Sequence, residues 1–346
     1  MFFPNAAILL DPVILILLGV IVGILGGFFG VGGGFLITSG LLVLGVPPLF
    51  AVGTGLSVVM GSAIMNIIKH NGMGNVDFKL GIIMLCGTIP GIFVATTINN
   101  RLNESGLAET VISLLFIVIF TGLGLFMIYD FCKSKFSSTS HSETESRKGL
   151  TSKIQSLRIP PHSIKILDRR LSTYITLPTS GVNQLSIFIP ITIGTCVGVL
   201  AGLLGIGGGF ILMPLLIYII GIPTTIAIGT NLFQIIIVGS FGTFLYAVDS
   251  HVDPMMVIIM LFSASLGSQI GARATQVVEP NNIRILFGIT VLSGSIAITL
   301  KLISTIKMEL AFLSQISPLI LIGTSGMISL TIVSIVFKTL VFSRIR

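Results

Sequence analysis

Apolar residues run almost unbroken along most of this chain, in long stretches that short polar segments separate. A helix needs about 20 apolar residues to cross a hydrocarbon core about 30 Å thick, and the chain offers many such stretches. Their residues are continuously apolar and do not alternate with period two, so they predict helices and not the strands of a barrel. The pattern therefore predicts an all-α polytopic membrane protein.

The apolar stretches follow the same order twice. In the first half they cover 12–31, 33–46, 48–68, 80–98 and 110–129, and in the second half 187–204, 207–221, 224–248, 255–274 and 283–300. One further stretch, 316–337, has no partner in the first half, and about nine to eleven hydrophobic segments are expected in total. We divide the chain into a first transmembrane repeat (1–130), a basic polar linker (131–186), a second repeat (187–303) and an additional C-terminal transmembrane helix (304–346).

Two glycine-rich phrases mark the same position in both halves. Residues 27–35 read Gly-Phe-Phe-Gly-Val-Gly-Gly-Gly-Phe, and residues 202–210 read Gly-Leu-Leu-Gly-Ile-Gly-Gly-Gly-Phe. The phrases 45–54 and 221–230 then share the pattern Gly-x-Pro followed by Ala-x-Gly-Thr. The copies lie 175 residues apart at the glycines and 176 apart from the prolines onward. The chain is therefore a duplication around two broken helices, a pattern that marks the substrate site of many transporters.

The repeat continues into the fourth apolar stretch of each half. Asp77 and Asp253 keep the offset of 176. Each directly precedes a span, which favours helix capping over a role in ion coupling. The glycine pairs 87/91 and 267/271 align at an offset of 180, and this alignment predicts short insertions in the second half.

The second stretch of each half is too short to cross a membrane alone. About 14 residues reach only about 21 Å as a helix. We expect each to form a re-entrant hairpin or broken pair with the first stretch, bent at the glycines. If both members return to the side from which the chain entered, the two repeats have inverted topology, which is the architecture of alternating-access transporters.

The positive charges predict an orientation, because Lys and Arg that flank spans are retained in the cytoplasm. When the linker is placed inside, all of the 19 basic residues except Arg101, Lys301 and Lys307 fall on its side. We therefore expect a multi-pass protein of the plasma (inner) membrane with its N-terminus outside and its linker and C-terminus cytoplasmic. A plain loop is favoured for residues 164–174, with a short amphipathic surface helix as the alternative.

Composition narrows the function classes. The chain is 53% hydrophobic and 9% charged, with a mean hydropathy of +1.07, so its main partner is the lipid bilayer. The net charge of +7 is concentrated on the predicted cytoplasmic side, so no nucleic-acid partner is expected. A homo-oligomer and a cytoplasmic partner at the linker stay open.

An enzyme is disfavoured. An intramembrane enzyme needs a Ser/His pair, two aspartates or an HExxH motif at bilayer depth. The chain shows none of these, because its 4 histidines and 12 acidic residues lie in loops or at span ends. The three cysteines are isolated. We expect no catalytic residues, metal or cofactor.

A small anion is the ligand that the two breaks favour. A helix that begins after a break carries unpaired N–H groups with partial positive charge, and glycines let an oxyanion approach the backbone closely. No basic residue lies deep within a predicted span, so dipoles and hydroxyls would hold the anion reversibly. The predicted substrate-binding residues are Gly32, Gly33, Gly34, Gly53, Thr54, Gly207, Gly208, Gly209, Gly229, Thr230, Asn231 and Gln234.

Each polar residue in this set has a structural alternative. A membrane threonine often bonds its own helix, which is the alternative for Thr54 and Thr230. Asn231 and Gln234, like Asn66 and Gln269, are costly to bury and either line a cavity or bond a neighbouring helix. The GxxxG spacing of glycines 19, 23, 26 and 30 is typical of helix packing, so these four are assigned mainly to packing and the two triplets to the site.

The duplicated phrases resemble the sulfite exporter TauE/SafE family of membrane permeases. The resemblance rests on Gly-x-x-Gly-[Val/Ile]-Gly-Gly-Gly-Phe and on the Gly-x-Pro…Ala-x-Gly-Thr phrase after each copy, and covers the chain apart from the linker. It implies transport of sulfite, organosulfonates or related small sulfur-containing anions. The long linker departs from compact members, and so does Gly55 where the second half has Asn231. A channel, or a transporter of another small anion, is the alternative.

Overall fold

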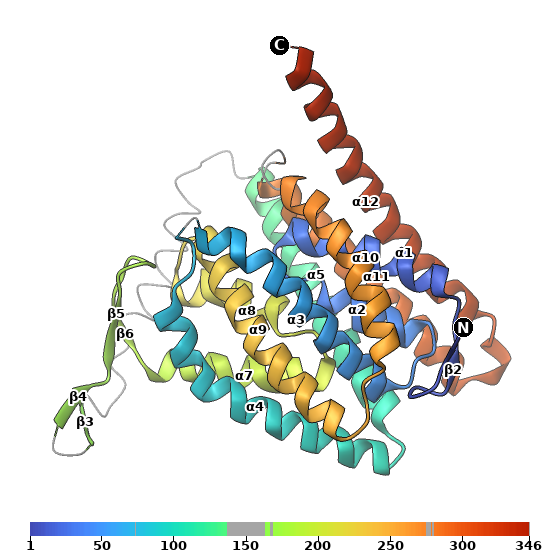
Figure 1. The fold of residues 1–346 in the computed structure, drawn as a ribbon, viewed down its shortest axis with the longest axis horizontal. Helices are drawn as coiled ribbons and strands as arrows, with labels where there is room; N and C mark the ends of the chain where they lie inside the picture. The colour runs from blue at the N-terminus through green and yellow to red at the C-terminus, as the bar shows by residue number, and fades with distance from the viewer. Residues whose placement is uncertain (73, 137–162, 167–168, 275–277, 279, 346) are drawn as a thin grey trace.

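The computed structural model describes residues 1–72, 74–136, 163–166, 169–274, 278 and 280–345, and Figure 1 shows them as a bundle of packed helices with short hairpins of strands. Within the described residues, eight helices are long and apolar enough to cross a membrane. The predicted all-α polytopic membrane fold is confirmed. Half of the predicted linker, residues 137–162 and 167–168, lies outside the described residues.

The helices follow the predicted stretches closely. The first repeat contains α1 (Pro12–Phe29), α2 (Gly34–Val43), α3 (Pro48–Gly72), α4 (Phe78–Glu104) and α5 (Ala108–Phe136). The second contains α7 (Phe188–Leu204), α8 (Gly209–Leu215) with the π-helical turn η1 (Leu216–Ile220), α9 (Thr224–Val248), α10 (Pro254–Ala274) and α11 (Pro280–Ile306). The short 3₁₀ turn η2 (Met308–Leu310) leads to the additional helix α12 (Leu313–Ile345).

The fourth helix of each repeat begins at a capped aspartate. The Asp77 carboxylate accepts a hydrogen bond from the Leu80 N–H at 3.0 Å. The Asp253 carboxylate accepts bonds from the N–H groups of Met255 and Met256, each at 3.1 Å. These bonds satisfy N–H groups that a helix start leaves unpaired. The predicted capping role is confirmed.

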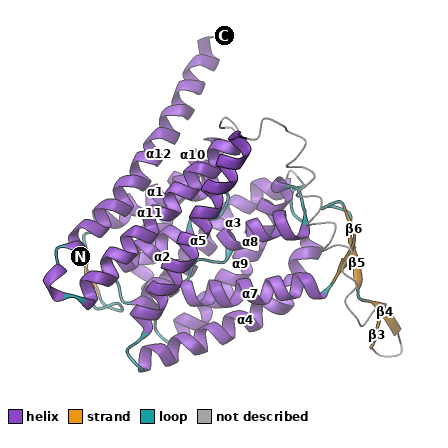
Figure 2. Ribbon diagram, turned by 180° about the vertical axis from the view of Figure 1, so that it is seen from behind, coloured by secondary structure: helices purple, strands orange, loops and turns teal. Residues whose placement is uncertain are grey.

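The two repeats interleave instead of forming separate bodies. Helix α1 packs along α10, and its counterpart α7 packs along α4, while α3 packs on α9 and α5 on α11. Missing side chains allow the close contacts: Gly23 faces the carbonyl of Ala264, and Gly198 faces the carbonyl of Thr88. In Figures 1 and 2, α4 and α7 run side by side along the lower edge of the bundle, and α3 lies beside α9 nearer its centre.

The same contacts correct the alignment of the repeats. Gly23 and Gly198 are equivalent at an offset of 175, and their partners Ala264 and Thr88 at 176. Helices α4 and α10 also begin 176 residues apart. The predicted insertion, which rested on the offset of 180, is wrong. Small residues recur about every four positions in these helices, so aligning glycines alone shifts the match by one helical turn.

Each broken pair returns to the side from which it entered. At one end, the Asn5 amide donates to the Val252 carbonyl at 3.1 Å, and Gly53 packs on the carbonyl of His251. The segment before α1 and the start of α3 therefore meet the same loop, 249–253. The second repeat behaves alike at the loop before α4, which contacts Ser180 before α7 and Gly229 in α9. The pairs are re-entrant, and the repeats have inverted topology.

Short β-hairpins precede the first helix of each repeat. Strand β1 (Phe2–Phe3) pairs with β2 (Ile8–Leu9) before α1, and β5 (Tyr174–Leu177) pairs with β6 (Val182–Ser186) before α7. The two hairpins lie on opposite sides of the bundle (Figures 1 and 2). A further pair of antiparallel strands, β3 (Ser163–Ile166) and β4 (Arg169–Ser172), shows that both the favoured plain loop and the alternative amphipathic helix at 164–174 are wrong. Apolar residues at 164 and 166 alternate with polar ones, which suits strands.

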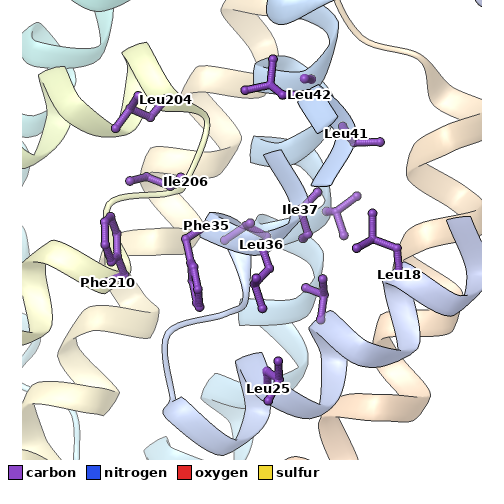
Figure 3. Close-up of a cluster of buried hydrophobic side chains, with 14 of the residues drawn as sticks. Leu18, Leu25, Phe35, Leu36, Ile37, Leu41, Leu42, Leu204, Ile206 and Phe210 are labelled. Carbon is purple, nitrogen blue, oxygen red and sulfur yellow. The ribbon is translucent and has the colours of Figure 1, made fainter. Parts of the chain in front are cut away.

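The core lies where the two breaks meet. Every residue of α2 is buried. Phe35 and Phe210, which follow the two glycine triplets, stack with ring centroids 5.8 Å apart and an interplanar angle of 21°. Phe120 packs edge-on against both rings. Figure 3 shows Phe35 and Phe210 facing each other beside Ile206. An aromatic cluster therefore fills the centre of the bundle.

Candidate functional site

The glycines of the two breaks adopt backbone angles that only glycine accepts readily. Gly30, with φ of 69°, caps the end of α1, and Gly33, with φ of 74°, caps the start of α2. Gly205, with φ of 70°, caps the end of α7, and Gly208, with φ of 73°, caps the start of α8. This left-handed conformation strains residues that carry a Cβ. The predicted breaks therefore occur at the predicted glycines.

The helix starts after both breaks leave backbone N–H groups without helical partners. In α2, Leu36 and Ile37 donate to the Gly33 carbonyl, and in α8, Ile211 and Leu212 donate to the Gly208 carbonyl. The N–H groups just before these are the ones that helix geometry leaves unpaired. No side chain caps either start. Each break thus presents the partial positive charge of a helix N-terminus.

The two breaks lie against each other. The position that a Cβ would take on Gly34 lies 2.6 Å from the Ile206 carbonyl oxygen, and the same position on Gly209 lies 3.0 Å from the Val31 carbonyl oxygen. Val59 from α3 contacts both Gly32 and Gly207, and its repeat counterpart Ile235 does the same from α9. The structure therefore brings the two predicted triplets, Gly32 to Gly34 and Gly207 to Gly209, into one place.

Asn231 lies beside the second break with no hydrogen-bond partner. Its side chain is fully buried, and both its Nδ2 and its Oδ1 are unpaired. Nδ2 lies 3.1 Å from the Cβ position of Gly209. Unpaired buried polar atoms are rare because each costs about 1–3 kcal/mol. Of the predicted site residues, Asn231 is therefore the one with a buried donor and a buried acceptor available to a ligand.

The first break has a different polar residue, which sequence reasoning missed. Thr38 in α2 donates its hydroxyl to the Gly205 carbonyl of the second break at 2.9 Å. Gly55, the repeat counterpart of Asn231, packs directly on that hydroxyl. A single threonine in a short apolar helix resembles one that bonds its own backbone, so only its place at the crossing distinguishes it.

The repeated Gly-Thr pairs contact the loop before α4, residues 74–77, and the loop before α10, residues 249–253, which we call the two mouths. The Thr230 hydroxyl accepts a hydrogen bond from the Asp77 N–H at 3.0 Å, and the Thr54 hydroxyl accepts one from the Asp253 N–H at 3.5 Å. The preceding Gly229 packs on the carbonyl of Asn75. These pairs connect α9 and α3 to the loops before α4 and α10.

Gln234 and Asn66 have separate surroundings. The Gln234 amide donates to the Gly81 carbonyl, and its oxygen accepts from the Thr88 hydroxyl at 3.4 Å, so it joins α9 to α4. Asn66 lies with Ser62 and Ser268 in a narrow gap of about 190 Å³ beside Gly32. The Ser62 hydroxyl also donates to the Gly32 carbonyl at 3.3 Å. The gap has no room for a water-sized sphere, so the structure is closed around the first break.

Charged and titratable groups lie at the end of α2 and in the loop before α10. A cavity of about 440 Å³ at the end of α2 is lined by Gly45, Glu109 and Lys301 among others. In the loop before α10, burial lowers the pKa of the His251 imidazole, and the charge of Asp249 partly opposes this. Among the described residues, no group of three His, Cys, Asp or Glu could hold a metal ion.

Comparison of the sequence with models of protein families gives a family for a chain with this arrangement of broken, re-entrant helices. The model of the family described as "Sulfite exporter TauE/SafE" matches residues 15–298. The chain belongs to the sulfite exporter TauE/SafE family. This TauE/SafE protein is therefore an integral, multi-pass membrane permease, as the predicted resemblance implied.

Two bacterial relatives support the assignment to membrane transporters. The "Probable membrane transporter protein YunE" of Bacillus subtilis (strain 168) is 25% identical over 69% of this chain and 76% of its own length. A "Probable membrane transporter protein" of Xylella fastidiosa (strain 9a5c) is 26% identical over 67% of this chain and 72% of its own length. No solved structure matches this chain significantly.

Proposed function

We propose that this TauE/SafE protein is a secondary transporter of small sulfur-containing anions, such as sulfite or organosulfonates, and works by alternating access without a catalytic step. The observation that carries the proposal is the buried, unpaired amide of Asn231 beside Gly209, where two helix starts meet. A small oxyanion would pair with that amide and with the free N–H groups of the breaks.

The anion is held by the glycine triplets and Asn231 in this proposal. Helix N-termini supply partial positive charge, and the missing side chains let the anion approach the backbone. The site is supported at the two mouths by Thr230 and Thr54, whose hydroxyls accept hydrogen bonds there. It is supported at α4 by Gln234, whose amide donates a hydrogen bond to that helix. The hydroxyls of both threonines accept a bond and still have a hydrogen to donate.

Alternating access would come from relative movement of the interleaved helix pairs. The α1–α10 and α4–α7 pairs pack through glycine and other small residues, which leaves few interlocking side chains to oppose sliding. The closed gap beside Gly32 would widen when the α1–α10 pair moves. Because inverted repeats are related by a pseudo-two-fold axis in the membrane plane, the other half can make the equivalent movement toward the opposite side. The site then opens to one side at a time.

Flux of radiolabelled sulfite into proteoliposomes tests the proposal. We expect saturable uptake that responds to an imposed membrane potential and to a pH gradient. Taurine, sulfoacetate, thiosulfate and sulfate serve as competitors that rank the substrates. Protein-free liposomes give the background. The absence of flux for every sulfur oxyanion, in protein shown to be folded, contradicts the sulfur-anion assignment, while flux that does not saturate favours a channel.

We also propose that the N-terminus and the loop 101–107 lie outside the cell and that the linker lies in the cytoplasm. Ser105 and Thr179 are both exposed, and the proposed orientation puts them on opposite sides of the membrane. In a variant whose native cysteines are replaced, Ser105→Cys should react with a membrane-impermeant maleimide in intact cells. Thr179→Cys should react only after the cells are opened. The reverse labelling pattern contradicts the orientation.

A further inference from the structure

The amide of Asn231 has two unpaired ends, not one. Nδ2 is a donor and Oδ1 is an acceptor, and both are buried without a partner. A ligand that completes this site must satisfy a donor and an acceptor together.

The amide lies where the two broken helices cross. Gly209 is the first residue of α8, and its Cβ position lies 3.1 Å from Asn231 Nδ2 and 3.0 Å from the Val31 carbonyl oxygen of the other break. Cδ1 of Ile235 lies 2.5 Å from the same position, so this side chain must move before a ligand can sit between the amide and the Val31 carbonyl. A ligand seated there would meet the helix start of α8 on one side and further acceptor oxygen on the other.

The side chains packed directly on the breaks are apolar, and the charged residue Asp77, which is buried, bonds Thr230 next to Asn231 through its backbone N–H. The side chains packed on the breaks are Val59, Ile235 and the stacked rings of Phe35 and Phe210. Transfer of an ion into such a low-dielectric region is costly, and the Born cost grows with the square of the charge. A dianion therefore pays about four times the cost of a monoanion. Dipoles and one neutral amide compensate a single charge better than a double one.

We infer that the anion taken up at Asn231 is a singly charged oxyanion that carries its own hydrogen-bond donor, as hydrogen sulfite does. Its oxygens accept from Nδ2 and the backbone N–H groups, and its O–H donates to Oδ1. A fully ionised oxyanion has no donor, so it would leave Oδ1 unpaired and facing negative oxygens. This inference rests on the proposed function and narrows its substrate class.

Sulfite flux at two pH values tests the inference. Proteoliposomes with equal pH on both sides are assayed one unit below and one unit above the second pKa of sulfurous acid, at subsaturating total sulfite. We expect the initial rate to be about tenfold higher at the lower pH, since the hydrogen-bearing fraction changes by about that factor. Methanesulfonate, a monoanion without a donor, and sulfate, a dianion, should compete weakly at both pH values.

Variants of Asn231 connect the pH effect to this residue. Asn231→Leu removes both the donor and the acceptor at nearly constant volume. Because it replaces an unpaired buried amide, its thermal unfolding temperature should equal or exceed that of the natural protein, while sulfite flux falls at least tenfold. Asn231→Gly, which places the residue of the first repeat at this position, gives a second test if the leucine variant does not fold. Ser240→Ala, at an exposed position of α9, is the matched control.

The outcomes separate two conclusions. Sulfite flux that is equal at both pH values, or equally inhibited by methanesulfonate, overturns the inference and leaves the proposed transport standing. A leucine variant that transports normally with the same pH ratio also overturns the inference. If folded protein transports neither sulfite at either pH nor any other sulfur oxyanion, the proposed function fails, and this inference fails with it.

Discussion

The two breaks have nearly the same backbone angles at their glycines but different polar side chains. The φ angles of Gly33 and Gly208 differ by only a degree, and Val59 and Ile235 occupy equivalent positions. Yet Thr38 donates to a backbone carbonyl across the first break, while Asn231 beside the second has no partner. Duplication has thus kept the geometry that forms two helix starts. Among the described side chains at the breaks, the buried amide without a hydrogen-bond partner lies at the second break.

The two mouths differ in a similar way. At the loop before α4, both oxygens of Asp77 are bonded, one to the Leu80 N–H and the other to the Ser180 hydroxyl at 2.6 Å. At the loop before α10, one oxygen of Asp253 caps its helix and the other is buried without a partner. The equivalent hairpin residue, Asn5, bonds a backbone carbonyl instead. One mouth is therefore held more tightly than the other.

The largest expected effect is a test of the shared backbone. Gly33→Val and Gly208→Val each place a β-branched side chain at positive φ, which costs about 1–2 kcal/mol, and press it against Val22 or Val197. We expect both variants to insert but to lose at least tenfold in anion flux. Gly122→Val in α5, where a Cβ would meet no atom within 4 Å, is the matched control. Normal flux in both site variants contradicts a glycine-lined site.

The breaks could be predicted from sequence because they depend on a residue type that the backbone requires. Positive φ at Gly30, Gly33, Gly205 and Gly208 leaves glycine as the only comfortable residue. The helices were predictable for a related reason, since continuous apolar runs in lipid have few other structures available. Both features depend on the composition of short segments and not on distant contacts.

The features that sequence reasoning missed depend on distant contacts. Asn5 and Ser180 are equivalent at an offset of 175, but the hairpins around them share no pattern, since strand pairing uses backbone groups. The position of Thr38 at the second break also required the fold. The slipped alignment of α4 with α10 had a similar cause, because small residues repeat at every turn and fit several registers.

The second prediction sharpens the difference between the two mouths. Asp77→Ala removes a helix cap and the acceptor of the buried Ser180 hydroxyl, so it should lower the free energy of unfolding by about 2–3 kcal/mol. Asp253→Ala removes a cap alone and should cost about 1 kcal/mol. Thermal unfolding in detergent measures both. Asp77→Asn retains a good capping group and should fall between the natural protein and the alanine variant.

A double-mutant cycle isolates the bond between hairpin and helix. Ser180→Ala alone should destabilise the protein, but Ser180→Ala should add little in the background of Asp77→Ala, because the two side chains share one hydrogen bond. Additive effects would mean that the hairpin is held by its apolar residues and not by this bond.

The smallest expected effects separate a structural from a ligand-binding role for the repeated threonines. Thr230→Val leaves the buried Asp77 N–H without an acceptor and should cost about 1–2 kcal/mol. Thr54→Val should cost less, because its bond to the Asp253 N–H is 3.5 Å long and therefore weaker. If the threonines also bind the anion, the KM for sulfite should rise in both variants by similar factors, whatever their stability. If KM is unchanged while the unfolding temperature falls more in Thr230→Val than in Thr54→Val, the Gly-Thr pairs have a structural role. The glycine triplets and Asn231 are then the binding groups.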